Sequence, residues 1–458
     1  MVEMTKDVKT LLGDPKKALL KMSVPLFISL IVSQINSFVD MFWCSSLGTD
    51  ALAAVGIVSS FCFLLSGVGN GLGIGMSVAM AKRIGAKEKD VAERIAAQGI
   101  VLILTVSVIV TPIFLLLGDP MISWIGGDVA HSESVAYAYP YFLTGFISFA
   151  HGVVAGLLRA EGAAKRSMTI MLLSVAFNMV LDPLLAYGFG WGIAGLAWAT
   201  VLSTALSLIP AVYWYFIDRS TYINIRLRGF QFDVGLTKEY LRIGVPKMIE
   251  LNIMSVINLG LVYYLVVCGG TAGVVLYNTT WKYVSLLMIP SQALGGGLVP
   301  ICAAAYGGGN FKKVREGYSY SLMIALAITI IVSFIIAIFS DFFAIVFTSS
   351  GSAMELREEM SHTIRLFAIF IPFYAWINIS SSLLQAIYMA DRSMYSTFIR
   401  NILLVVVFWY TSSMNLDAMW WGLILCEIFG GFLMGTWAEL GLRKRMTTYG
   451  REGQKVTA

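Results

Sequence analysis

Long apolar runs recur along the whole chain, and they constrain its fold more than any other feature. A helix that crosses a hydrocarbon core of roughly 30 Å needs about 20 apolar residues. Membrane barrels instead show alternating segments of about ten residues, whereas the runs here are unbroken. The sequence therefore predicts an all-α integral membrane protein with twelve transmembrane helices. We place these helices at residues 19–44, 51–80, 92–117, 134–158, 167–187, 191–217, 241–268, 272–304, 318–347, 363–389, 395–414 and 417–440.

The composition agrees with a protein dissolved in lipid. Hydrophobic residues make up 58% of the chain and charged residues 13%, whereas soluble domains carry about 25% charged residues. A net charge of +5 would suggest nucleic acid in a soluble protein, but the basic residues here cluster between the apolar runs. The five cysteines lie within apolar runs and form no CxxC pair. We therefore expect the lipid bilayer as a partner, no nucleic acid, and buried cysteines.

The basic residues predict the orientation of the chain. If the twelve runs span the membrane, 29 of the 32 Lys and Arg residues fall in segments on one side. The exceptions are Arg357, Arg365 and Lys282, the last of which lies within a run. Lys and Arg collect on the cytoplasmic side of membrane proteins. This pattern predicts a multi-pass cell membrane protein with both termini in the cytoplasm, and the lysine-rich start lacks the pattern of a cleaved signal peptide.

The chain divides into two similar halves. A long polar stretch at 218–239 separates six runs from six, so we predict an N-terminal lobe at 1–225 and a C-terminal lobe at 226–458. Because each half has an even number of spans, the copies share one orientation, which is typical of alternating-access transporters. Three segments match between the halves: 157–168 with 383–394, 23–25 with 244–246, and 85–88 with 307–310.

Few ionisable side chains lie within the predicted spans. A charge at mid-bilayer costs at least about 2.5 to 3.5 kcal/mol, so each such residue is a candidate for function. The candidates are Asp40, His151 and Asp182 in the first half and Glu250, Lys282 and Glu427 in the second.

Asp40 and Asp182 are predicted in the outer halves of the first and fifth helices. Asn178 precedes Asp182 by four residues and shares its helix face, beside Pro183, which removes a backbone donor. Two neighbouring carboxylates in a low dielectric cannot comfortably both be ionised, so the pair should bind a proton or a cation. Thr200 could add an oxygen ligand suited to a hard ion. The alternative is that both acids are solvated at the outer helix ends.

The remaining ionisable residues carry weaker predictions. His151 could relay a proton, although a single histidine on a helix face is more often hydrogen-bonded inside a bundle. Glu250, Lys282 and Glu427 could supply one ion pair and one unpaired carboxylate, and a structural pair with Lys282 is as plausible as a functional one.

No catalytic motif accompanies these residues. The glycines of segment 67–75 do not fit the GxGxxG spacing and lie inside a span, where they favour close helix packing or a hinge. The chain contains no P-loop, HExxH or GxSxG motif. We therefore expect neither an enzyme nor transport driven by the chain's own ATP hydrolysis.

The chain resembles the multidrug and toxic compound extrusion (MATE) transporters, and within them the DinF-like branch. The resemblance spans about 17–442 and includes the two six-helix lobes. Its motifs are the Pro25 to Asp40 spacing, the Asn178-x-x-x-Asp182-Pro183 element, segment 159–167 and segment 195–200.

The resemblance implies a monomeric antiporter that expels organic cations or amphipathic compounds in exchange for protons or sodium, without a cofactor. Asp40, Asn178, Asp182 and Thr200 match the cation site of the N-terminal lobe and would hold the ion if it is sodium. Pro25 matches the proline at which the first helix is proposed to bend on protonation.

A second cation site is known in another branch, with acidic residues on the seventh and tenth helices. Glu250 is only loosely placed for it, and 363–389 contains no carboxylate, so the sequence does not predict a complete site there.

Two other functions are alternatives to antiport. A flippase for an anionic lipid-linked oligosaccharide precursor, from the same superfamily, should offer several basic residues to a pyrophosphate, yet Lys282 is the only one clearly inside a span. An integral membrane enzyme is the third possibility, and no recognisable catalytic constellation supports it.

Overall fold

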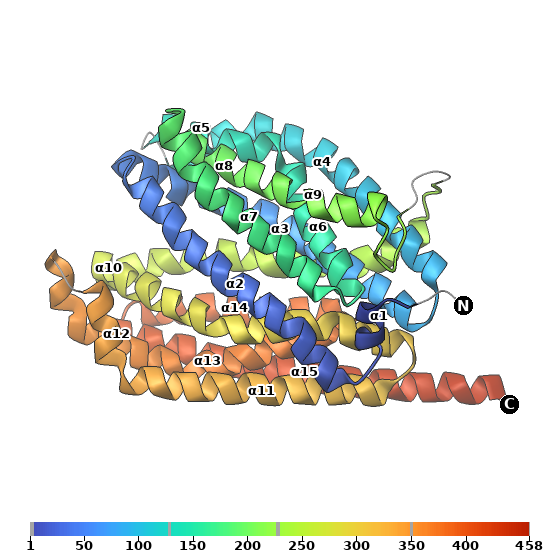
Figure 1. Cartoon of the computed structure of the whole chain (residues 1–458). Helices are drawn as coiled ribbons and strands as arrows, with labels where there is room; N and C mark the ends of the chain where they lie inside the picture. Colours follow the sequence, from blue (N-terminus) through green and yellow to red (C-terminus); the bar gives the residue numbers. More distant parts are fainter. Residues whose placement is uncertain (1–3, 127–129, 226–229, 349–350, 458) are drawn as a thin grey trace.

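The computed structural model describes residues 4–126, 130–225, 230–348 and 351–457, and these residues contain no strand. They form two helical bundles side by side, with the first half of the chain in one and the second half in the other (Figure 1). The predicted all-α membrane fold is therefore confirmed. The predicted boundary between 225 and 226 adjoins 226–229, which lie outside the described residues.

The N-terminal bundle holds the first six predicted spans. The fourth span is bent by 52° between α5 and α6, at Thr144, whose hydroxyl donates to the carbonyl of Pro140 at 2.5 Å. Its helices are α1 (Lys6–Leu11), α2 (Pro15–Ser45), α3 (Thr49–Gly85), α4 (Lys89–Gly126), α5 (His131–Leu143), α6 (Gly145–Ala160), α7 (Ala164–Pro183), the π-helix η1 (Leu184–Gly188), α8 (Gly192–Ser207), α9 (Ile209–Val212) and the π-helix η2 (Tyr213–Ile217).

The C-terminal bundle holds the last six spans, and its first helix makes up two of them. Gly270 has φ 56° and ψ −146°, which interrupts α10, and the Tyr277 hydroxyl donates to Asn258 Oδ1 across this break at 3.1 Å. The chain thus folds back on itself at Gly270. The helices are α10 (Val234–Gly307), α11 (Phe311–Ile338), α12 (Ser340–Phe347), the 3₁₀ helix η3 (Gly351–Leu356), α13 (Arg357–Ala386), α14 (Ala390–Thr411) and α15 (Leu416–Thr457).

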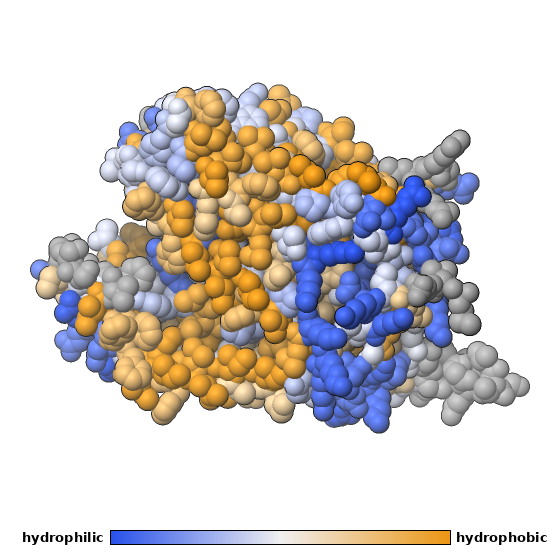
Figure 2. Space-filling model, in the orientation of Figure 1, coloured by the Kyte–Doolittle hydropathy of each residue, from blue (hydrophilic) through white to orange (hydrophobic). Residues whose placement is uncertain are grey.

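The length and polarity of these helices fit a bilayer. Within the described ranges, ten helices are long and apolar enough to span it, and the bent α5–α6 pair supplies an eleventh. Because α10 supplies two, the predicted number of twelve is reached. Figure 2 shows an apolar surface across the middle of the molecule and a hydrophilic surface at the end where both termini lie. We call this the terminus-bearing end.

The glycines of segment 67–75 let α3 pack closely on two helices. A Cβ at Gly71 or Gly75 would overlap α10, whereas a Cβ at Gly73 would overlap the backbone of Gly152 on α6. Small residues allow helix backbones to approach in this way. Close packing, one of the two interpretations of this segment, is therefore confirmed, and α3 becomes the element that joins the bundles.

The two bundles close on each other at the terminus-bearing end through matched glycines. A Cβ at Gly85 would overlap the carbonyl oxygen of Ala304, and a Cβ at Gly307 would overlap that of Lys82. Gly85 and Gly307 begin two segments that match between the halves of the sequence, so the same contact is made twice, once in each direction.

An ion-pair cluster lies beside this contact. Glu239 on α10 accepts hydrogen bonds from Lys82 Nζ at 2.9 Å, Arg83 Nη2 at 2.6 Å and the Tyr388 hydroxyl at 2.9 Å. Toward the opposite end the bundles diverge (Figure 1), and Figure 2 shows a hollow between them there. The molecule is therefore closed at the terminus-bearing end and open at the other.

Replacing Gly307 with alanine should weaken this closure. The added methyl group overlaps the Lys82 backbone, and overpacking of this kind costs about 1 to 3 kcal/mol. Spin-label distances between α3 and α10 should show the terminus-bearing ends moving apart. Gly56→Ala is the matched control, because no atom lies within 4 Å of a Cβ there. Equal distances in the Gly307→Ala variant and the parent would contradict the role of this contact.

Candidate functional site

The predicted acidic residues come together between α2 and α7 in the half of the N-terminal bundle away from the termini. Asn178 and Asp182 share one face of α7 and are 3% and 1% exposed. Asp40 projects from α2, is half-buried, and its carboxyl group lies within hydrogen-bonding reach of that of Asp182. Pro183 ends the α-helical part of α7, after which the chain continues as the π-helix η1.

An asparagine that the sequence analysis missed links the two acids. Asn36 Nδ2 donates to Asp40 Oδ1 at 3.1 Å, to Asp40 Oδ2 at 3.2 Å and to Asn178 Oδ1 at 2.7 Å. Asn178 Nδ2 in turn donates to Asp182 Oδ1 at 2.9 Å. Asn36 precedes Asp40 by four residues, the spacing that relates Asn178 to Asp182, so this signal could have identified it. We call these four residues the carboxylate chain.

Thr200 lies at the edge of the carboxylate chain. Its hydroxyl is 3.4 Å from Asn178 Nδ2 and donates to the carbonyl of Leu196 on its own helix at 3.1 Å. It therefore contacts the amide rather than either acid. Within the described residues, no group of three or more His, Cys, Asp or Glu side chains could hold a metal ion.

The geometry fixes what the carboxylate chain can do. Two neighbouring carboxyl groups shielded from water repel each other when both are ionised, so they favour a shared proton or a bound cation. The amide N–H groups of Asn36 and Asn178 already occupy positions around the acids. The arrangement is thus suited to taking up and releasing one positive charge.

Pro25 lies in a helix that is continuous in this conformation. Pro25 is buried within α2 and has no backbone N–H to donate. Its carbonyl accepts a hydrogen bond from the Ser29 hydroxyl at 2.9 Å. Nearby, a Cβ at Gly297 of α10 would lie 2.7 Å from Ser23 Oγ. Movement of α2 around Pro25 would therefore also disturb its contact with the C-terminal bundle.

The secondary candidate Glu250 has a different partner from the one considered in the sequence. Lys247 Nζ lies 2.8 Å from Glu250 Oε1, and the hydroxyls of Ser381 and Ser393 donate to the carboxylate at 3.1 and 2.9 Å. The carboxylate of Glu250 is therefore paired with the ammonium group of Lys247.

Glu427 pairs with an arginine whose location the sequence analysis misjudged. The distribution of basic residues predicts Arg400 on the cytoplasmic side and Lys282 as the only basic residue clearly inside a span. Arg400 instead lies inside α14, and its Nη1 is 2.8 Å from Glu427 Oε2 with both side chains almost fully buried. The ion pairs of Glu250 and Glu427 thus involve Lys247 and Arg400 and not Lys282. A buried guanidinium needs a carboxylate partner. Polar residues flank Arg400 in the sequence, so the sequence does not indicate that its side chain is buried.

His151 lines a small cavity next to Thr200. The cavity has a volume of about 180 Å³ and is also lined by Tyr141 and Asn70. The Nε2 atom of His151 is buried and has no hydrogen-bond partner in the described part of the chain. Whether His151 relays a proton or is hydrogen-bonded inside the bundle therefore stays a prediction.

Glu161, in the connection between α6 and α7, is a second residue that sequence reasoning missed. It accepts hydrogen bonds from the Tyr215 hydroxyl at 2.8 Å and from the backbone N–H groups of Tyr222 and Ile223 at 2.7 and 3.3 Å. Burial raises the pKa of Glu161 to about 7, although these hydrogen bonds oppose the shift. The sequence around Glu161 is a short polar connection, which does not indicate that the side chain is buried.

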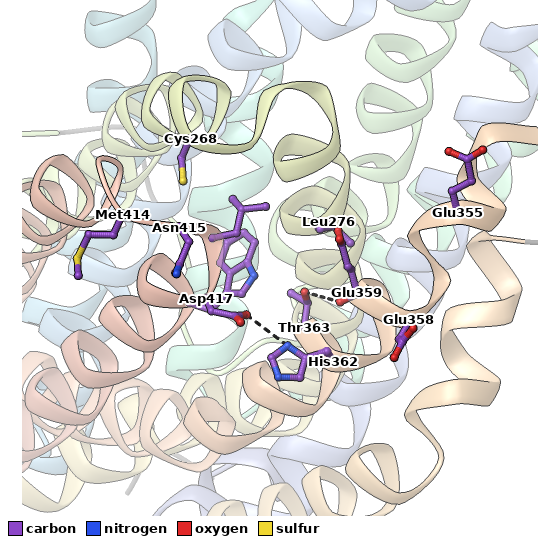
Figure 3. A pocket seen from close by; sticks show the side chains of 12 residues that line it. Cys268, Leu276, Glu355, Glu358, Glu359, His362, Thr363, Met414, Asn415 and Asp417 are labelled. Carbon is purple, nitrogen blue, oxygen red and sulfur yellow. Dashed lines mark hydrogen bonds and ion pairs between the residues drawn. The ribbon is translucent and has the colours of Figure 1, made fainter.

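A further cavity lies in the C-terminal bundle at the end away from the termini. It has a volume of about 750 Å³ and is lined by four carboxylate side chains (Figure 3), together with Trp420. His362 Nδ1 lies 3.4 Å from Asp417 Oδ1 in this cavity, and both side chains are exposed. The carboxylates belong to Glu355, Glu358, Glu359 and Asp417.

Replacing Arg400 with methionine should destabilise the C-terminal bundle. The variant leaves Glu427 buried without its cation, which costs about 3 to 5 kcal/mol. The double variant Arg400→Met/Glu427→Leu should recover most of the loss, because it removes both charges. Thermal unfolding of the purified protein in detergent measures both effects. A single variant as stable as the parent would show that the pair does not hold the bundle together.

Comparison with known proteins assigns the chain to a family. The MatE family model matches 25–184 and 246–411, one segment in each half. Multidrug export protein MepA of Staphylococcus aureus (strain MSSA476) is 24% identical over 331 residues, covering 70% of this chain and 71% of MepA.

Solved structures match over nearly the whole length. The crystal structure of MATE in complex with MaL6 has a TM-score of 0.93 and 30% identity, covering 97% of this chain and 100% of that one. A structure described as the outward-facing conformation of a multidrug resistance MATE family transporter gives the same TM-score, identity and coverage of 97% and 100%. Because the family model matches both halves and the fold agrees throughout, the chain belongs to the MATE family of membrane transporters and is not an enzyme.

Proposed function

We propose that this protein is a secondary active antiporter that exports organic cations or amphipathic compounds in exchange for an inward flow of positive charge. The carboxylate chain is the observation that carries the proposal, since buried acids in an apolar bundle are costly unless they serve a function. The relative MepA is named a multidrug export protein. A flippase for a lipid-linked precursor is less favoured, because the name of MepA refers to the export of drugs and not to the transport of lipids.

The coupling ion that fits this geometry best is the proton. A sodium ion needs several oxygen ligands directed at one point, whereas Asn36 presents an N–H group to both oxygens of Asp40. The contact between the Asp40 and Asp182 carboxyl groups is the one that a shared proton makes. Loss of this proton would leave the carboxylates of Asp40 and Asp182 both ionised, so that they repel each other. This repulsion would shift α2 relative to α7 and bend α2 at Pro25.

The basic, closed end faces the cytoplasm in this proposal, as the distribution of Lys and Arg predicts. The described conformation is then outward-open, and the cavity with four carboxylates lies on the outer side of the cell membrane. Its negative charge would favour cations at the point of release. A single chain contains both bundles and the carboxylate chain, so the monomer is the transporting unit.

Asp40→Asn and Asp182→Asn should each abolish efflux of a cationic dye such as ethidium, because neither altered pair can cycle between charged and neutral states. Proteoliposomes with a pH gradient and a sodium gradient imposed separately identify the ion. Asp50→Asn makes the same chemical change at an exposed position near the start of α3 and should leave efflux unchanged. Undiminished efflux by the Asp40 variant would contradict the mechanism, and efflux driven only by sodium would reject the proton.

Asn36→Ala should slow efflux about tenfold, because it removes the N–H donor to Asp40 and leaves Asn178 Oδ1 without a partner, at a cost of about 1.5 to 3 kcal/mol. Ser37→Ala is the control, since the exposed Ser37 hydroxyl bonds only to the carbonyl of Ser33 on its own helix. The initial rate of dye efflux measures the difference. Equal rates for the two variants would show that the link between the acids is dispensable.

A further inference from the structure

A cavity of about 400 Å³ lies between the two bundles, toward the terminus-bearing end. Its walls come from α2, α3, α6 and α7 of the first bundle and from α10 and α13 of the second. Cavities of roughly 300 to 1,000 Å³ hold small ligands. The position between the bundles means that a ligand here would contact both halves of the transporter.

The charge of this cavity is opposite to that expected for an organic cation. Two basic side chains, Arg159 and Lys247, line it, and no acidic side chain of the described residues does. Lys247 is balanced by its ion pair with Glu250. Arg159 differs, because no described side chain forms a hydrogen bond or ion pair with its guanidinium group. The excess positive charge of the cavity therefore comes from Arg159.

The hydrogen-bonding groups of the cavity have the same bias. Asn378 Nδ2 is buried without a partner among the described residues, and so is the hydroxyl of Ser77, a residue only 2% exposed. These groups and Arg159 come from α13, α3 and α6. A buried donor that lacks an acceptor costs about 1 to 3 kcal/mol, and a buried charge costs more. An oxyanion ligand would supply the acceptor that these groups lack.

We propose that this cavity binds the carboxylate or phosphate group of an amphipathic anion, with Arg159 as the charged contact and Asn378 and Ser77 as further donors. The planar guanidinium matches the geometry of both oxyanions. Apolar side chains including Leu26, Ile74 and Leu251 complete the walls and would hold the hydrocarbon part of the ligand. The site goes beyond the proposed function, because its residues are distinct from the carboxylate chain.

The test uses the purified full-length chain in nanodiscs of zwitterionic phosphatidylcholine and the soluble amphiphile hexyl phosphate. A ligand that binds the folded state raises the unfolding temperature in proportion to its concentration relative to Kd. Hexyl phosphate should raise the unfolding temperature of the parent. Hexyltrimethylammonium has the same chain and the opposite charge. Any effect that it has should be the same in the parent and in Arg159→Gln. The Asp40→Asn variant should respond like the parent, which separates this site from the antiport mechanism.

Arg159→Gln should weaken the response to hexyl phosphate by about tenfold or more, since a charge-assisted bidentate contact is lost. Arg94→Gln removes the same charge from an exposed position and should respond like the parent. Asn378→Ala tests the site without altering its charge and should give a smaller loss of affinity. Equal responses to hexyl phosphate in the parent, Arg159→Gln and Asn378→Ala would overturn the proposal, as would an equally large loss of the response to the cationic probe in Arg159→Gln.

A second set of nanodiscs identifies the source of the anion. If an acidic lipid headgroup fills the site, added phosphatidylglycerol should stabilise the parent more than Arg159→Gln and should suppress the response to hexyl phosphate. If the ligand is a solute, the response to hexyl phosphate should be the same with and without phosphatidylglycerol. Stabilisation of the parent and Arg159→Gln to the same extent by both the lipid and the solute would contradict binding at Arg159.

Discussion

The close approach of α3 and α10 is the contact on which the rest of the structure depends. Because α3 presents glycine to α10 at Gly71, Gly75 and Gly85, backbone atoms of α10 approach α3 closely at all three positions. This brings Glu239 within reach of Lys82 and Arg83. A contact that is tight at one end leaves the other ends of the bundles free to separate, and the carboxylate chain and the large acidic cavity both lie in that separated half.

Much of this architecture could be predicted from the sequence, because the bilayer imposes a strict requirement on helix length. The apolar runs located every span, whereas the match between 85–88 and 307–310 indicated a repeat and did not predict that the two segments contact each other. Asp40, Asn178 and Asp182 were likewise found from their cost in lipid and their helical spacing.

The residues that the sequence did not predict share a physical reason. Asn36 is neutral, so it carries no penalty that marks it as unusual, and its role depends on a residue 142 positions away. Arg400 and Lys247 were assigned to the membrane surface because polar residues flank them, although each pairs with a carboxylate inside the C-terminal bundle. Arg159 was assigned to a connection, whereas its side chain reaches the cavity between the bundles. Burial of a long basic side chain depends on what packs above it, which one chain's sequence does not specify.

The glycines of α3 also bear on the order in which the protein is made. Ribosomes deliver α3 well before α10, so the face with Gly67, Gly71 and Gly75 has no partner from the second bundle while the first is being inserted. During that interval its exposed backbone must be covered by lipid or by the insertion machinery. Arrival of α10, the first helix of the second bundle, removes the need for that protection, so docking of the two halves can begin before the later helices have been synthesised.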